Sequence, residues 1–176
     1  MIDREIKVIG FIGLGVMGCS MSKNLLKNKN WNVLVKDLNA NKEKELENQG
    51  AKIAGDTREI FTLSDLVITC LPGGDFVRDL YYGKDKYISN IKINQFIIDM
   101  STSQPDLMIK LENEIKIKGA HFADAPIART RQAAIDGTLA IMVGADKDVY
   151  NKILPVLRYM GKDILHCGKS GTGQLT

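Results

Sequence analysis

The stretch VIGFIGLGVMG, residues Val8 to Gly18, decides the fold of this chain. An uncharged run leads into Gly13, the first of three glycines with the spacing G-x-G-x-x-G. From Val16 to Lys27 the apolar side chains recur at helical spacing. The pattern therefore predicts a strand over Ile6 to Ile12, a tight glycine turn, and a helix that begins as the turn ends.

Apolar runs alternate with helical patterns along the rest of the chain. Continuous apolar strands separated by helices are typical of a parallel sheet covered on both faces. The sequence therefore predicts a doubly wound α/β domain with a mainly parallel sheet. The expected strands are 6–12, 32–36, 52–54, 66–70, 96–99, 122–125, 139–143 and 164–166, and the expected helices are 16–27, 41–49, a short one from 56, 103–118 and 146–159.

The composition excludes several classes of protein. Of the 176 residues, 44% are apolar and 26% are charged, which is ordinary for a soluble globular chain. The net charge of +3 is too small to favour nucleic acid or a membrane as a partner. No signal peptide or membrane span is expected. The spacing of Cys19, Cys70 and Cys167 fits no disulfide or metal site, so we expect reduced, buried thiols in a cytoplasmic protein.

The glycine turn has the context that a dinucleotide-binding motif requires, because it follows a strand and opens a helix. Gly13 permits a tight turn, Gly15 lets a pyrophosphate approach the main chain, and Gly18 lets the helix pack close to the strand. The helix start offers free N–H groups and a positive dipole end to phosphates. The alternative is a plain strand-to-helix turn. The expected cofactor-binding residues of this segment are Gly13, Leu14, Gly15, Val16, Met17 and Gly18.

Asp37 ends the second expected strand, about 20 residues past the glycine turn. A carboxylate there accepts hydrogen bonds from the adenosine ribose hydroxyls and repels a 2′-phosphate. Asp37 therefore favours NAD over NADP as the cofactor, with Lys36 expected to face away. The alternative is an aspartate that caps the following helix.

The run GFIGLGVMGCSMSKNLLKN, residues 10–28, resembles the opening signature of the β-hydroxyacid dehydrogenases. That family includes 3-hydroxyisobutyrate dehydrogenases, tartronate semialdehyde reductases and 6-phosphogluconate dehydrogenases. Further motifs follow in the family order and cover nearly the whole chain: Cys70-Leu71-Pro72, Asp99-Met100-Ser101-Thr102, Asp124-Ala125-Pro126-Ile127 and Gly137-Thr138-Leu139. The resemblance implies a Rossmann-type fold, hydride transfer between NAD and a small hydroxyacid or its semialdehyde, and a ribose–nicotinamide site lined by Leu71, Pro72 and Thr102.

One segment departs from the family pattern. Where the family usually has Ser-Gly-Gly, which holds the substrate carboxylate, this chain has Ala128, Arg129 and Thr130. A guanidinium binds anionic oxygens as a rigid fork. The Arg-Thr variant is similar to that of 3-sulfolactaldehyde reductases, which hold a sulfonate. The resemblance thus implies a small anionic substrate bound at these three residues; the alternative is that Arg129 is a solvated loop arginine.

The last six residues, GTGQLT, resemble the start of the family motif G-x-G-x-x-x-K-x-x-N, whose lysine is the general acid/base. That lysine would follow Thr176 directly. We therefore expect residues 1–176 to be a dinucleotide-binding domain cut before its catalytic group, inactive alone and lacking an all-helical second domain. The full-length parent is expected to form a homo-oligomer through that domain. The alternative is a non-catalytic module that senses dinucleotides.

Overall fold

The computed structural model describes residues 5–176, so the start of the charged N-terminal segment lies outside the described residues. The strands are β1 (Val8–Ile12), β2 (Asn32–Lys36), β3 (Lys52–Ile53), β4 (Leu66–Thr69), β5 (Phe96–Asp99), β6 (His121–Asp124), β7 (Ile127–Ala128), β8 (Leu139–Gly144) and β9 (Gly161–Gly168). The helices are α1 (Val16–Leu25), α2 (Ala40–Glu47), α3 (Thr57–Leu63), α4 (Gly74–Tyr82), α5 (Pro105–Ile117), α6 (Arg131–Asp136), α7 (Lys147–Leu157) and α8 (Thr172–Leu175), with a 3₁₀ turn η1 (Tyr87–Asn90).

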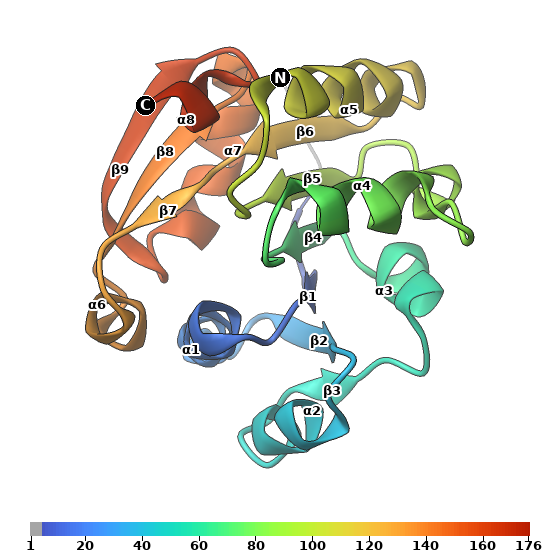
Figure 1. Ribbon diagram of the computed structural model, residues 1–176. Coiled ribbons are helices and arrows are strands. Elements are labelled where there is room, and N and C mark those ends of the chain that lie inside the picture. The colour runs from blue at the N-terminus through green and yellow to red at the C-terminus, as the bar shows by residue number, and fades with distance from the viewer. Residues whose placement is uncertain (1–4) are drawn as a thin grey trace.

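The strands form one sheet in the order β3-β2-β1-β4-β5-β6-β8-β7, with β9 on the other side of β8 (Figure 1). Strands β1 to β6 are all parallel, whereas β8 runs antiparallel to β6 and β7. The predicted doubly wound, mainly parallel sheet is confirmed. Because the strand order reverses at β1 and β4, the carboxyl ends of these strands form the crevice in which open α/β sheets bind ligands.

Two hydrophobic cores lie on the two faces of the sheet. Alternate residues of each strand point to opposite faces, so Ile9 and Phe11 of β1 join one core and Ile12 joins the other. The first core receives side chains from α1, α2, α6 and α7. The second receives side chains from α3, α4 and α5, which lie together along one flank of the sheet (Figure 1). Both faces are therefore covered, as continuous apolar strands require.

Local sequence signals set several boundaries. Gly10 has no side chain where α3 packs on β1, and a Cβ there would lie 2.5 Å from Ile60 and from Ser64. The Asp56 carboxylate caps α3 by accepting the Glu59 N–H at 2.8 Å. Glu59 in turn accepts the N–H of Gly55, the residue before the cap, so the two side chains bond to the backbone in both directions.

Other elements differ from the prediction. Strand β9 is longer than the expected 164–166, because pairing with β8 extends it over residues with little apolar character. Helix α4 was not predicted, because it begins with Gly74 directly after Gly73, and two adjacent glycines are typical of loops. The short elements α6 and β7 were also missed, whereas α8 lies in the final GTGQLT segment that was interpreted as the start of a helix. Cys19 is buried, whereas Cys70 and Cys167 are only partly buried, and all three are free thiols. Among residues 5–176, no helix combines the length and apolar character needed to cross a membrane.

Candidate dinucleotide site

A pocket of about 680 Å³ opens at the carboxyl ends of β1, β2 and β4. It lies where the strand order reverses, so the fold places it at the expected ligand position. Most of the predicted cofactor-binding residues line it: Gly13, Gly15, Val16, Met17, Gly18, Asp37, Leu71 and Pro72. The other two do not. Leu14 has a buried side chain, and Thr102 is exposed in the loop after β5.

The three glycines of the turn have different surroundings. A Cβ on Gly13 would overlap the carbonyl oxygen of Cys70, and Gly13 also has a φ of +96°, which L-residues rarely adopt. A Cβ on Gly18 would overlap the carbonyl oxygen of Gly13. A Cβ on Gly15 would meet nothing within 4 Å. Gly13 and Gly18 are thus required by the fold itself, whereas the space beside Gly15 belongs to the pocket.

The amino end of α1 faces this pocket without a side-chain cap. Gly15 is its N-cap residue, and the first turn carries no acidic side chain. The first N–H groups of a helix have no partner within the helix, and they carry the positive end of its dipole. Together with the open space beside Gly15, this start of a ten-residue helix provides a cradle that fits a pyrophosphate.

Asp37 connects the glycine turn after β1 to the segment that precedes α2. One carboxylate oxygen accepts the N–H of Leu14 at 2.6 Å, and the other accepts the N–H of Asn39 at 2.8 Å. The cap of α2 is Asn39, which accepts the N–H of Asn41, so the alternative role of Asp37 as the helix cap is wrong. Each oxygen of a carboxylate has a second lone pair, which leaves Asp37 able to accept from ribose hydroxyls.

Apart from the predicted residues, Val16 among them, the apolar wall of the pocket comes from segments that the sequence did not single out. Three apolar side chains, Val16, Leu38 and Phe76, are more than half exposed and all face this pocket. Exposed apolar groups gathered in one cavity suit a flat, apolar ligand surface such as a base. The sequence did contain a signal for this wall, because Phe76 and Leu80 have the i, i+4 spacing of apolar residues on one face of a helix. Lys36 was expected to face away, and this expectation is wrong, because its long side chain reaches the pocket wall. The lining residues without a prediction are Ile12, Leu38, Thr57, Cys70, Phe76, Asp79, Leu80, Lys84, Asp85 and Tyr87.

At the carboxyl ends of β4 and β5, buried polar groups shape the loop that carries Leu71. The Ser101 hydroxyl accepts the Leu71 N–H at 2.9 Å and donates to the Asp99 carboxylate at 2.7 Å. The Thr69 hydroxyl donates to the same Asp99 oxygen at 2.6 Å, and the second Asp99 oxygen has no hydrogen-bond partner. Burial raises the pKa of Asp99 to about 6 against these hydrogen bonds, which lower it. Desolvation likewise raises the pKa of the Cys70 thiol to about 12, so the thiol in the pocket is neutral.

The next strand holds the end of the described chain in place. The fully buried Asp124 carboxylate accepts the Gly171 N–H at 2.6 Å and the Gln174 N–H at 3.1 Å. Burial raises the pKa of Asp124 to about 6, and the two backbone donors oppose that shift. The Gln174 side chain donates to the Ser101 carbonyl at 2.8 Å and accepts the Ser103 N–H at 3.0 Å. Helix α8 is thereby fixed to the loop that contains Thr102.

The three expected substrate residues lie at the end of β7 and outside the lining of the pocket. Ala128 ends β7, and the Thr130 hydroxyl caps α6 by accepting the Ala133 N–H at 3.3 Å. Arg129 has a φ of +95°, a left-handed conformation that usually belongs to glycine. Its guanidinium donates to the Thr138 carbonyl at 3.0 Å and forms an ion pair with Asp163.

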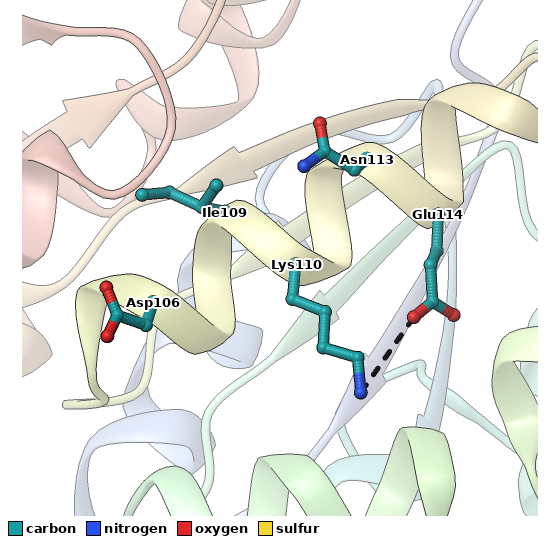
Figure 2. A pocket seen from close by; sticks show the side chains of 5 residues that line it. All are labelled: Asp106, Ile109, Lys110, Asn113 and Glu114. Carbon is teal, nitrogen blue, oxygen red and sulfur yellow. Dashed lines mark ion pairs between the residues drawn. The ribbon is translucent and has the colours of Figure 1, made fainter.

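A second, shallower hollow of about 460 Å³ lies along α5 (Figure 2). Figure 2 shows its five side chains projecting from this one helix, and the single ion pair drawn joins Lys110 to Glu114 at 4.0 Å. Groups from one helix surface do not converge on a ligand as those of the first pocket do. No group of three potential metal ligands occurs within residues 5–176.

The fold and the glycine cradle define a dinucleotide-binding α/β domain. The chain belongs to the family described as the NAD binding domain of 6-phosphogluconate dehydrogenase, whose model matches residues 8–168. It is 38% identical over 171 residues to 2-(hydroxymethyl)glutarate dehydrogenase of Eubacterium barkeri, covering 97% of this chain and 56% of that protein. It is 34% identical over 165 residues to 3-sulfolactaldehyde reductase of Escherichia coli, covering 94% and 55%.

Solved structures of related proteins have the same fold as this chain. The 3-hydroxyisobutyrate dehydrogenase of Mycobacterium tuberculosis, solved with L-serine, superposes with a TM-score of 0.89 at 30% identity and covers 97% of this chain and 57% of that one. This chain thus spans a little over half the length of its relatives. Neighbours of the same fold have been solved with NADP⁺ and with NAD⁺, so the fold does not select between the two cofactors.

Proposed function

We propose that this chain is the cofactor domain of an oxidoreductase that transfers hydride between NAD and a small anionic β-hydroxyacid or its semialdehyde. One observation carries the proposal. Of the three glycines in the turn, Gly15 alone has free space where a side chain would be, and this space lies at the uncapped amino end of α1. A backbone shaped to leave that space fits a pyrophosphate.

The residues of the chain hold and orient the cofactor in this proposal. N–H groups at the start of α1 bind the pyrophosphate, and Asp37 accepts the ribose hydroxyls. Because the Asp37 carboxylate would face a 2′-phosphate, NAD binds more tightly than NADP. Leu71 and Pro72 cover the nicotinamide side, with Thr102 nearby. The bound nicotinamide supplies the hydride donor or acceptor.

Substituting Gly15 by Val tests the cradle. The variant should fold, because the added side chain enters open space, but its affinity for NAD should fall at least about 100-fold, or about 2.7 kcal/mol. Gly18→Val is the matched control, and it should lose folding as well. Titration calorimetry with NAD and NADP, together with thermal unfolding, separates the outcomes. Undiminished binding by the Gly15 variant, or a preference of the unaltered chain for NADP, would contradict the proposal.

The substrate end of the proposal rests on residues 128–130. A non-glycine residue held in the left-handed region costs about 1–3 kcal/mol and is retained mostly where the side chain has a role. The contacts to Thr138 and Asp163 use two of the five guanidinium N–H groups of Arg129 and fix its orientation. We propose that the remaining donors bind the carboxylate or sulfonate of the substrate.

Arg129→Gly in the full-length parent tests this assignment, because glycine tolerates the backbone conformation. KM for an anionic aldehyde should rise about 10- to 150-fold, which corresponds to about 1.5–3 kcal/mol for lost charge-assisted hydrogen bonds. Arg131→Ala, at the adjacent exposed arginine, is the control and should leave KM unchanged. Equal kinetics for the two variants would remove Arg129 from the substrate site.

General acid/base catalysis, worth about 10²- to 10⁴-fold in rate, is proposed to come from a lysine outside these 176 residues. NADH oxidation by this chain should therefore be far slower than by a longer version that includes the following domain, with carboxylate and sulfonate semialdehydes tested in parallel. Comparable rates would place the catalysis within these residues. Cofactor binding without turnover in either version would favour a dinucleotide-sensing module.

A further inference from the structure

Glu43 is a buried carboxylate beside the adenosine end of the pocket. It lies in the first turn of α2, and 6% of the residue is exposed. A single oxygen, Oε1, accepts the backbone N–H of Asp37 at 3.0 Å and forms an ion pair with the ammonium of Lys36 at 3.0 Å. Buried glutamates are rare unless they are paired, so this contact accounts for the position of Glu43.

The partners of Glu43 are the two charged residues at the end of β2. Lys36 and Asp37 both line the pocket and have opposite charges. An unpaired ammonium beside the ribose would attract a 2′-phosphate through charge-assisted hydrogen bonds. Asp37 would repel the same phosphate. The two neighbours therefore favour different cofactors, and the preference depends on which charge is available to the ligand.

We infer that Glu43 is a specificity-determining residue, which holds Lys36 away from the cofactor and leaves Asp37 to set the charge at the ribose. This inference rests on the proposed function. Glu43 acts through its two neighbours and does not itself touch the cofactor. It neutralises the charge of Lys36, and it holds the backbone of Asp37 in place. The ion pair is largely buried, since the two side chains are 24% and 7% exposed, so salt screens it little.

Glu43→Gln tests the inference. Glutamine keeps the size of the side chain and an oxygen that accepts the Asp37 N–H, and it removes the charge that holds Lys36. Calorimetric titration of the 176-residue chain should show that the affinity for NADP, relative to NAD, rises at least about 10-fold, as one new charge-assisted contact allows. Adding Lys36→Met to this variant should return the ratio to that of the unaltered chain. Glu47→Gln, an exposed position on the same helix, should leave the ratio unchanged.

The outcomes are distinguishable. If the unaltered chain binds neither dinucleotide, the proposed function fails. If it binds NAD but the Glu43 variant keeps the same NADP-to-NAD ratio within about twofold, the inference alone is overturned.

Amine acylation of the unaltered chain, followed by mass spectrometry, provides a test that needs no variant. Lys36 should react at least about fivefold more slowly than the exposed Lys84, because its ammonium group is largely buried and bonded to Glu43, which keeps the reagent away. Equal rates would contradict the inference.

Discussion

Two loop clusters at the carboxyl edge of the sheet are each held together by an aspartate. At the ends of β1 and β2, Asp37 accepts the N–H groups of Leu14 and Asn39. At the end of β6, Asp124 accepts those of Gly171 and Gln174. The bonding pattern is the same, with two oxygens and two backbone donors. The surroundings differ, because Asp37 lines an open pocket whereas Asp124 is fully buried.

This difference in burial gives the two aspartate side chains different roles. A carboxylate that borders solvent keeps acceptor sites for a ligand, and it remains charged at low energetic cost. A carboxylate that is sealed in the protein has only its internal donors to stabilise the charge, and burial raises its pKa, as it does for Asp124. The first arrangement suits recognition of a ligand, and the second fixes a helix to the sheet.

Of the two aspartates that hold the loop clusters, Asp124 should have the larger effect on stability when it is replaced by Ala. The substitution leaves two backbone N–H groups without an acceptor, and each unsatisfied buried group costs about 1–3 kcal/mol. We therefore expect the free energy of unfolding to fall by about 2–5 kcal/mol in urea titrations. Asp136→Ala, at an exposed site, should change it by less than about 0.5 kcal/mol. Similar losses for the two variants would mean that Asp124 does not hold α8.

Asp99→Asn should change the pH dependence of stability. The folded-state pKa of Asp99 is about 6, above the ordinary value of 3.8, because of burial. The stabilising contribution of its protonated form is therefore complete below about pH 4 and is lost as the pH rises through 6. A shift of that size corresponds to about 3 kcal/mol.

Urea titrations between pH 4 and pH 7 measure this effect. The free energy of unfolding of the unaltered chain should fall relative to that of the Asn variant over this interval. Asp124 has a similarly raised pKa and remains in both proteins, so the difference between the two curves reports the titration of Asp99 together with its charge interaction with Asp124. Parallel curves would show that Asp99 titrates with an ordinary pKa.

Asp37→Ala should reduce stability less than Asp124→Ala, by about 1 kcal/mol, because water from the open pocket can take the place of the lost carboxylate. The same variant should bind NAD and NADP with similar affinity if Asp37 sets the preference for NAD that the proposed function includes. Unfolding and cofactor titrations on one sample measure both quantities. A loss of stability as large as that of Asp124→Ala would remove the contrast between the two clusters.

The sequence predicted the cluster around Asp37 because its determinants are local. The spacing of Gly13, Gly15 and Gly18 and the distance to Asp37 fall within one strand–helix–strand unit. The alternation of apolar strands and helices likewise predicted the sheet. The interpretation failed to predict α4 because two glycines precede its regular turns, and tertiary packing on the sheet outweighs that composition.

The cluster around Asp124 could not be predicted in the same way. Asp124 and Gly171 are 47 residues apart, and only the sheet brings them together. The ion pair between Arg129 and Asp163 and the pocket wall from α3, α4 and η1 also depend on packing between distant segments. Glu43 is the exception, since it lies six residues from Asp37, but its spacing in an otherwise polar helix gave no sign that it would be buried.

The hydrogen bonds of Gln174 connect α8 to the loop of Ser101 beside the pocket. The Leu71 N–H in the pocket wall donates to Ser101, and the Ser101 carbonyl accepts from Gln174. If a ligand shifts the loop of Ser101, it must change the stability of α8 by some coupling free energy. Reciprocity then requires that anything that stabilises α8 changes the affinity for that ligand by the same amount. On that condition, a molecule bound at α8 would change the affinity of the pocket for its ligand through a single amide side chain.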